Sequence, residues 1–306
     1  MRLVFCGTPD FAVVSLTALV DYGNEVAAVV TRPDRRKGRG GKLTPSPVKE
    51  AALSLGLSVC QLHPRDPAFL PWLAGQRPEV LVVVAYGHIL SEAVLRAAPA
   101  VNVHASLLPA YRGAAPVQRA ILNGEPLTGV TTMYLDPGMD TGDIILQEAL
   151  PIREEDDAGA LLERLGQAGA RLLGRTLDCL AQGGCPRVKQ DETGASYAPP
   201  LTPADEVIRW EEAPGAIVNR VRALSPRPGA YTLWQGRRLK IWRARIGPAV
   251  AGSAPGLVNR AGPGEIIIGA GEGTVAVFEL QAEGGKRLPA DAFLRGSVMG
   301  EGARLG

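Results

Sequence analysis

The chain has 306 residues, of which 46% are hydrophobic and 21% are charged, and its formal net charge is +2 at pH 7. This length suffices for two domains with cores of their own, and the composition is that of an ordinary globular protein. The scattered cysteines and histidines argue against a disulfide framework and a metal site. The opening MRLVFCGTPDF has too short an apolar run for a signal peptide, and no apolar stretch could span a bilayer. We therefore expect a cytoplasmic protein that does not bind membranes.

Short apolar runs alternate with helix-like segments over the first half of the chain. The runs that read as buried strands are residues 2–6, 26–30, 79–85 and 100–104. Residues 11–22 and 47–55 read as helices, because each segment ends just before a glycine. This alternation predicts an α/β fold with a Rossmann-like, doubly wound, mostly parallel sheet. Ligands of such sheets bind beyond the carboxyl ends of the strands.

The second half of the chain has a different pattern of predicted elements. A long helix is predicted at 155–182, followed by a stretch rich in Gly and Pro. A helix at about 213–224 and paired β-like runs after it predict a small, OB-like β-barrel. The predicted division is an α/β domain at 1–189, a linker at 190–204 and a C-terminal barrel domain at 205–306.

Asn102 and His104 lie two residues apart at the end of the strand predicted at 100–104. Because side chains alternate between the faces of a strand, the amide and the imidazole share one face. They would stand side by side where ligands of a parallel sheet bind. Taken alone, local hydrogen bonding explains this pair as well as catalysis does.

Two basic series indicate a polyanionic partner such as nucleic acid. The first series, within residues 31–49, contains Arg32, Arg35, Arg36, Lys37, Arg39, Lys42 and Lys49 against a single acid, Asp34. The second runs from Arg220 to Arg245 without an acid, and Tyr231, Trp234 and Trp242 are interleaved with it. Basic residues beside aromatic ones on a small barrel are typical of nucleic-acid surfaces, whereas a solvated face and a barrel core are the alternative explanations.

The loop GTPDF at residues 7–11 occupies the place of a dinucleotide fingerprint but contains only one glycine. The second strand is followed by Arg32 rather than by an acidic residue. Both features argue against a nicotinamide cofactor.

The segment DPGMDTGDIILQ at 136–147 places Asp140 in a turn before a strand-like run. A loop aspartate usually caps backbone amides. Near His104, however, its carboxylate could orient the imidazole and accept a proton. The sequence alone leaves both roles open.

The motifs NVHASLLPAYRGAAPVQRAI and GMDTGDI together resemble those of the folate-dependent formyltransferases, whose catalytic residues are Asn, His and Asp. This resemblance implies the formyltransferase fold and assigns the catalytic roles to Asn102, His104 and Asp140. The segments FCGTPDFA, TRPDRRKGRGGKLTPSPVK and VVVAYGHIL resemble the members of the family that act on methionyl-initiator tRNA. The resemblance is strong over residues 1–150 and looser over 205–306.

The resemblance also implies ligands and binding residues. The formyl donor would be 10-formyltetrahydrofolate, with neither metal nor nicotinamide, and the acceptor would be methionyl-initiator tRNA, bound by a monomer. The folate would contact Ser106, Leu107, Leu108, Pro109, Gly87, His88, Ile89 and Leu90. His88 stands where the family has an aliphatic residue. The tRNA would contact Arg35, Arg36, Lys37, Arg39, Lys42, Arg237, Arg238 and Lys240.

Three other functions share some of these features. A formyltransferase for a purine-pathway ribonucleotide would have the same three catalytic residues but normally lacks the basic loop and the second domain. A nucleotide-sugar formyltransferase shares the SLLPxYRG turn and is the nearest enzymatic alternative. A non-catalytic RNA-binding relative would not need Asn102, His104 and Asp140 together.

Overall fold

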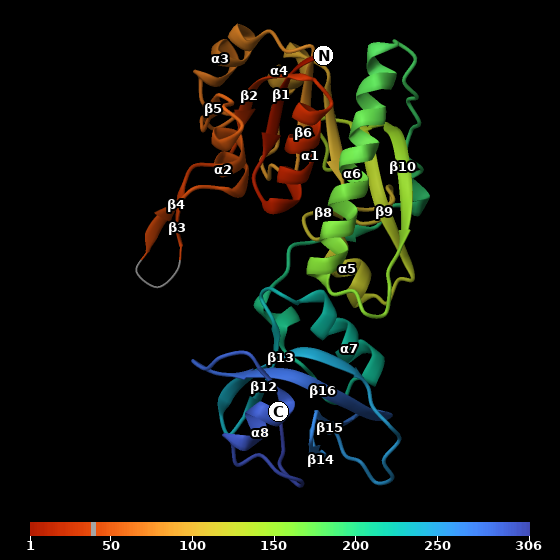
Figure 1. Cartoon of the computed structure of the whole chain (residues 1–306). Helices are drawn as coiled ribbons and strands as arrows, with labels where there is room; N and C mark the ends of the chain where they lie inside the picture. The colour runs from red at the N-terminus through yellow and green to blue at the C-terminus, as the bar shows by residue number, and fades with distance from the viewer. Residues whose placement is uncertain (38–40) are drawn as a thin grey trace. The chain divides into compact units, whose positions relative to one another are not determined.

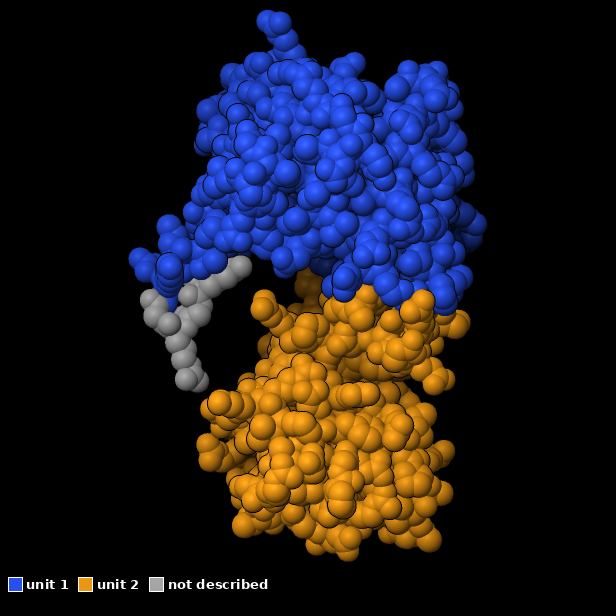
Figure 2. Space-filling model, in the orientation of Figure 1, with its two compact units in different colours: residues 1–116, 127–151, 162–199 blue, residues 117–126, 152–161, 200–306 orange. Residues whose placement is uncertain are grey.

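Figure 1 shows the computed structural model of the chain, which describes residues 1–37 and 41–306. The chain forms two compact units, coloured separately in Figure 2. The first unit consists of residues 1–116, 127–151 and 162–199, and the second of residues 117–126, 152–161 and 200–306. Among the described residues, every helix is too short or too polar to cross a membrane.

The first unit is built on a seven-stranded sheet of order β10-β9-β7-β6-β1-β2-β5. Its strands are β1 (Arg2–Gly7), β2 (Glu25–Val30), β5 (Val59–Cys60), β6 (Val80–Val84), β7 (Ala100–His104), β9 (Leu127–Tyr134) and β10 (Ile144–Pro151). The strands from β5 to β7 in this order are parallel, whereas β9 and β10 are antiparallel to their neighbours. The predicted mostly parallel α/β sheet is confirmed.

Helices cover both faces of this sheet, as a doubly wound fold requires. They are α1 (Asp10–Asp21), α2 (Pro47–Ser54), α3 (Phe69–Gln76), α4 (Glu92–Ala97) and α6 (Ala158–Ala181). Leu3 and Phe5 of β1 pack with buried residues of α1, α2 and α6, whereas Val4 and Cys6 pack with buried residues of α3 and α4. Because side chains alternate between the faces of a strand, each face of the sheet has its own hydrophobic core. The helices cover the faces, so the carboxyl ends of the strands are followed by loops.

The basic segment predicted as a loop after the second strand contains a small hairpin. Strands β3 (Arg35–Lys37) and β4 (Lys42–Thr44) pair antiparallel (Figure 1). At its base, Lys49 pairs with Asp34 at 2.8 Å, and Gln61 donates to the same carboxylate at 2.8 Å. Lys49 therefore has a structural role at the base of the hairpin.

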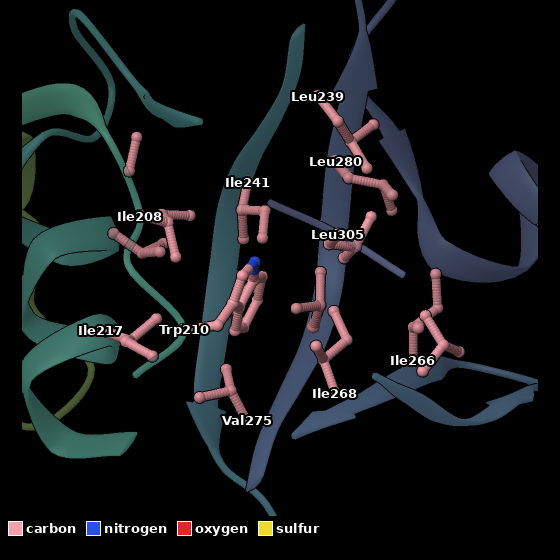
Figure 3. Close-up of a cluster of buried hydrophobic side chains, with 14 of the residues drawn as sticks. Ile208, Trp210, Ile217, Leu239, Ile241, Ile266, Ile268, Val275, Leu280 and Leu305 are labelled. Atoms are coloured by element: carbon pink, nitrogen blue, oxygen red, sulfur yellow. The ribbon is translucent and has the colours of Figure 1, made fainter. Parts of the chain in front are cut away.

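The second unit contains an antiparallel sheet of order β12-β13-β16-β15-β14, with β17 paired to β16. The strands are β12 (Ala230–Trp234), β13 (Arg237–Ile246), β14 (Val258–Gly262), β15 (Glu265–Ala270), β16 (Gly273–Ala282) and β17 (Leu288–Pro289). The associated helices are α5 (Pro116–Leu122), α7 (Pro214–Ala223) and α8 (Ala290–Arg295). Trp210 lies in the middle of the apolar core of this unit (Figure 3), and its indole nitrogen donates to Thr232 Oγ1 at 3.0 Å.

The stretch predicted as a linker at 190–204 is structured over much of its length. Strand β11 (Tyr197–Ala198) pairs in parallel with β8 (Arg112–Gly113), and residues up to 199 belong to the first unit. Two short 3-10 turns, Glu192–Gly194 and Pro203–Glu206, flank this strand.

Candidate active site

Asn102 and His104 lie on β7, between β6 and β9, at the carboxyl edge of the parallel strands. The two residues are 8% and 7% exposed. Burial of both is expected for a central strand whose neighbours are both in place. The side-chain amide of Asn102 forms no hydrogen bond with the part of the chain that the structure describes. An amide without a protein partner retains its donors for a ligand.

The structure brings Asp140 to His104. Asp140 lies in the loop between β9 and β10, and its Oδ2 is 3.6 Å from Nδ1 of His104. Its backbone adopts φ +54°, a left-handed conformation that is uncommon for residues other than glycine. The sequence alone could not establish this proximity.

The backbone on either side of Arg112 contacts both members of this pair. The carbonyl oxygen of Tyr111 is 2.9 Å from Nε2 of His104. Because a carbonyl only accepts, this ring nitrogen carries the proton of that hydrogen bond. The N–H of Gly113 donates to Oδ2 of Asp140 at 2.9 Å.

Arg112 is itself 1% exposed, although it is an arginine. Its guanidinium donates to Gln190 and to both carboxylate oxygens of Glu192. The amide nitrogen of Gln190 donates in turn to the backbone carbonyls of Asp140 and Gly142. Sequence reasoning missed these supporting residues. The arginine was visible in the motif SLLPAYRG, whereas Gln190 lay in a stretch rich in Gly and Pro that gave no signal.

The turn predicted to contact folate, Ser106–Pro109, is held in place by two side chains of the sheet. Thr131 Oγ1 accepts from the N–H of Leu108 at 3.1 Å and donates to the carbonyl of Ser106 at 2.7 Å. Gln147 donates to the carbonyl of Leu108 at 2.8 Å. The side chains of Ser106 and Leu108 are buried, and the hydroxyl of Ser106 donates to the carbonyl of Ala110. Leu107 and Pro109 are partly exposed.

The second predicted folate segment follows β6. Gly87 has φ +74°, and Arg32 donates to its carbonyl. Leu90 is buried, whereas Ile89 is 61% exposed. The ring of His88 lies edge-on to His63 and to Tyr86, with ring centroids 4.5 and 5.2 Å away.

His88 has an electropositive environment. Burial lowers the pKa of its imidazole, and so do the positive charges of Arg32, Arg35 and Arg65 and the neighbouring His63. His88 is therefore part of a basic cluster.

Of the predicted tRNA-contacting residues in the first basic series, Arg35, Arg36, Lys37 and Lys42 lie on the hairpin strands. Arg35, Arg36 and Lys42 are exposed, and Arg36 donates to the carbonyl of Gly41 at 3.0 Å. Lys37 ends β3, and Arg39 lies outside the described residues. Exposed cations on a protruding hairpin are accessible to phosphates.

In the second basic series, cations of β13 lie beside aromatic rings of β12 and β13. The guanidinium of Arg238 lies 4.5 Å from the ring centre of Tyr231, and Nζ of Lys240 lies 5.4 Å from that of Trp242. Arg237 is close to Glu283, at 4.0 Å. The exposed Arg238 thus lies at the surface beside a flat ring, whereas the half-buried Lys240 also donates to the carbonyl of Pro228.

Other arginines of the second series form hydrogen bonds within the unit and so have a structural role. Arg220 binds the carbonyl of Val207 and the carboxylate of Glu212. Arg222 donates to the backbone carbonyls of Asp156 and Arg153. The number of basic residues in the sequence is therefore larger than the number of cations that this unit has free for a ligand. Within the described residues, no group of three or more His, Cys, Asp or Glu side chains could hold a metal ion.

Comparisons with known proteins agree with this arrangement. Residues 1–177 match the formyl transferase family, and residues 200–298 match the formyl transferase C-terminal domain family. The chain is 52% identical to the methionyl-tRNA formyltransferase of Pelotomaculum thermopropionicum, over 100% of this chain and 99% of the relative. It is also 52% identical to the methionyl-tRNA formyltransferase of Moorella thermoacetica, again over 100% of this chain and 99% of the relative.

Solved structures show the same fold at low identity. The N-formyltransferase of Helicobacter canadensis, in complex with folinic acid and dTDP-3-aminofucose, matches with a TM-score of 0.68 and 20% identity over 92% of this chain and 100% of that one. HypX from Aquifex aeolicus, in complex with tetrahydrofolic acid, matches with a TM-score of 0.66 and 18% identity over 96% of this chain and 47% of that one. The fold, the two family matches and the full-length identity lead to one conclusion: this chain belongs to the methionyl-tRNA formyltransferase family.

Proposed function

We propose that this enzyme transfers the formyl group of 10-formyltetrahydrofolate to the α-amino group of methionyl-initiator tRNA, with Asn102, His104 and Asp140 as its catalytic residues. The identity of 52% over the full length of two methionyl-tRNA formyltransferases supports the reaction. The observation that carries the residue assignment is the 3.6 Å approach of Asp140 to His104 at the end of the strand that also bears Asn102.

The reaction requires attack by the neutral methionyl amine on the formyl carbon. Free α-amino groups have pKa values of about 7.7–8.0, so a useful fraction is neutral near pH 7. Attack forms a C–N bond and converts the formyl oxygen into an oxyanion. The bond between the formyl carbon and N10 of the folate then breaks, and the proton lost by the amine is transferred to N10. Two functions are needed from the protein: a donor for the oxyanion and a path for that proton.

Asn102 supplies the donor in this proposal. Its amide has no protein partner among the described residues, so it can donate to the oxyanion without breaking an existing hydrogen bond. One well-placed donor of this kind contributes about 3–4 kcal/mol of transition-state stabilisation.

His104 and Asp140 handle the proton and complete the oxyanion site. Nε2 of His104 donates to the Tyr111 carbonyl, so the formyl oxygen would share or replace this acceptor. Asp140, beside Nδ1, orients the ring and accepts the proton from the amine through water. The hydrogen bond from Gly113 keeps the carboxylate in place.

The folate is proposed to lie between the turn Ser106–Pro109 and the segment from Gly87 to Leu90. The first is rigid because Thr131 and Gln147 hold its backbone. A fixed turn beside the catalytic strand would hold the formyl carbon near Asn102 at little entropic cost.

The tRNA is proposed to contact the hairpin cations and the cation–aromatic surface of β12 and β13. Arg35, Arg36, Lys37, Arg39 and Lys42 form the first group, and Arg237, Arg238 and Lys240 form the second. Their charge suits a phosphate backbone, and the flat rings suit unpaired bases. We further propose that the enzyme is a cytoplasmic monomer, with a catalytic domain at 1–189 and a tRNA-binding domain at 205–306.

The test is formyl transfer from radiolabelled 10-formyltetrahydrofolate to two acceptors, methionyl-initiator tRNA and an amino-sugar nucleotide. We expect label in the tRNA and none in the sugar nucleotide. Transfer to the sugar nucleotide alone would overturn the acceptor assignment. Tight RNA binding without transfer to either acceptor would mean a non-catalytic relative.

A further inference from the structure

A side-chain clamp, formed by Arg112, Gln190 and Glu192, holds the turn that carries Asp140. Gln190 donates to the backbone carbonyls of Asp140 and Gly142, both at 2.8 Å. Its Oε1 accepts from Nε and Nη2 of Arg112, at 3.0 and 2.8 Å. Both ends of the Gln190 amide are therefore engaged, which fixes its orientation.

The turn needs such a support because its backbone is unusual. Asp140 has φ +54°, a left-handed conformation that is unfavourable for residues other than glycine and persists only where the surrounding structure determines it. A Cβ at Gly142 would lie 1.8 Å from the carbonyl oxygen of Tyr134, so the turn is also closely packed. Gln190 binds the carbonyls on either side of Thr141, and the hydroxyl of Thr141 donates to Asp136 at 2.7 Å. Gln190 is therefore the side chain that contacts the two carbonyls, while Asp136 holds the hydroxyl between them.

The other end of the clamp is anchored beside the same catalytic pair. Arg112 is 1% exposed and is paired with Glu192 through two hydrogen bonds, of 3.0 and 2.8 Å. Its chain neighbours Tyr111 and Gly113 contact His104 and Asp140. The clamp thus links the loop that holds the imidazole to the turn that presents the carboxylate.

We propose that Gln190 is a positioning residue for formyl transfer, which keeps the carboxylate of Asp140 beside His104 by fixing the turn 140–142. It acts through Asp140, so the inference rests on the catalytic role proposed for that residue. The distance between Asp140 and His104 is 3.6 Å, and a shift of about 1 Å at a reacting group can reduce a rate by about 10²-fold.

The first test compares three variants in the full-length enzyme. Gln190→Leu removes the donors and the acceptor, whereas Gln190→Glu keeps an acceptor for Arg112 but places a carboxylate against the two carbonyls. We expect each to lower kcat by about 10- to 100-fold, with KM for folate and for tRNA changed by less than about threefold. The matched control, Gln182→Leu at an exposed glutamine of the same unit, should retain wild-type kinetics.

The second test separates positioning from general damage. In an Asp140→Asn background, Gln190→Leu should change kcat by less than about twofold, because the group through which it acts is already gone. Equal effects in both backgrounds would overturn the proposal, as would wild-type kcat in Gln190→Glu or loss of folding in both Gln190 variants. Full activity of Asp140→Asn alone would instead refute the role of Asp140 in the proposed function.

Discussion

The N–H of Gly113 and the carboxylate of Asp140 form a 2.9 Å hydrogen bond between positions 27 residues apart in the chain. This bond is possible because Gly113 adopts φ +122° in β8, with β11 alongside. A Cβ at this position would lie 2.7 Å from the carbonyl oxygen of Ala198. The glycine is thus required both by its backbone conformation and by the close approach of β11.

Gly113→Ala should therefore impair both stability and activity. We expect a loss of roughly 1–3 kcal/mol in the free energy of unfolding, because the added methyl group must displace β11 or the turn. Activity should fall further than stability explains, since the backbone N–H that donates to Asp140 is displaced. Urea unfolding and steady-state kinetics on the same samples measure the two effects. Gly184→Ala, at a position with open space around its Cβ, is the control and should change neither.

The three proposed catalytic residues should behave as one unit. Asn102→Ala, His104→Ala and Asp140→Ala should each lower kcat by about 10²-fold or more, with smaller effects on tRNA affinity. The double variant of His104 and Asp140 should be little worse than the worse single variant, because the two groups act on one proton. Near wild-type turnover in any single variant would remove that residue from the mechanism.

The hairpin should contribute to tRNA binding through charge alone. Arg35→Ala and Arg36→Ala should weaken tRNA binding, and each lost phosphate contact should reduce the slope of log K against log salt by about 1. Binding of a folate analogue should be unchanged. Arg175→Ala, which removes an exposed arginine on α6, is the matched control. If the hairpin variants keep the wild-type salt slope, Arg35 and Arg36 are hydrated surface charges that do not contact the phosphates of the tRNA.

His88 should make stability fall as the solution is acidified. Its pKa is lowered in the fold by burial and by the surrounding Arg32, Arg35, Arg65 and His63. The unfolded chain then binds a proton more readily than the fold does, so stability decreases as pH falls below about 6.5, the unperturbed value, until the lower folded pKa is passed.

Titration of the His88 ring by NMR, together with unfolding at several pH values, checks this prediction. Arg32→Gln should raise the pKa of His88 towards its ordinary value, whereas Arg175→Gln should leave it unchanged. His88→Leu should flatten the stability profile between pH 6.5 and the folded pKa. A His88 pKa at or above its ordinary value in the wild-type protein would contradict the electrostatic argument.

The sequence predicted those parts of the fold that depend on hydrophobic patterning. Continuous apolar runs located β1, β2, β6 and β7, and alternation along β7 correctly predicted that Asn102 and His104 share a face. The β3–β4 hairpin escaped prediction because RRK and KLT lack an apolar face that would mark a strand.

The supporting residues of the site were harder to predict, for a physical reason. Gln190 and Arg112 are 78 positions apart, and a hydrogen bond between polar side chains leaves no periodic pattern in either segment. Local composition gave no sign of this bond, because the Gly and Pro content around Gln190 predicted a linker. The proximity of Asp140 and His104 likewise depends on how the β9–β10 loop folds back, which short-range propensities do not encode.

The second unit is assembled from three separate segments of the chain, and this determines how the enzyme should respond to limited proteolysis. Residues 117–126 and 152–161 belong to that unit although they precede residue 200 in the chain. Arg119 pairs with Asp205 at 2.8 Å, and Arg222 donates to the carbonyl of Asp156 at 2.8 Å. A protease cut in the exposed stretch 202–204 would therefore divide one folded unit between two polypeptides. The nicked enzyme should show two bands on a denaturing gel yet elute from a sizing column as a single species, held together without a covalent bond.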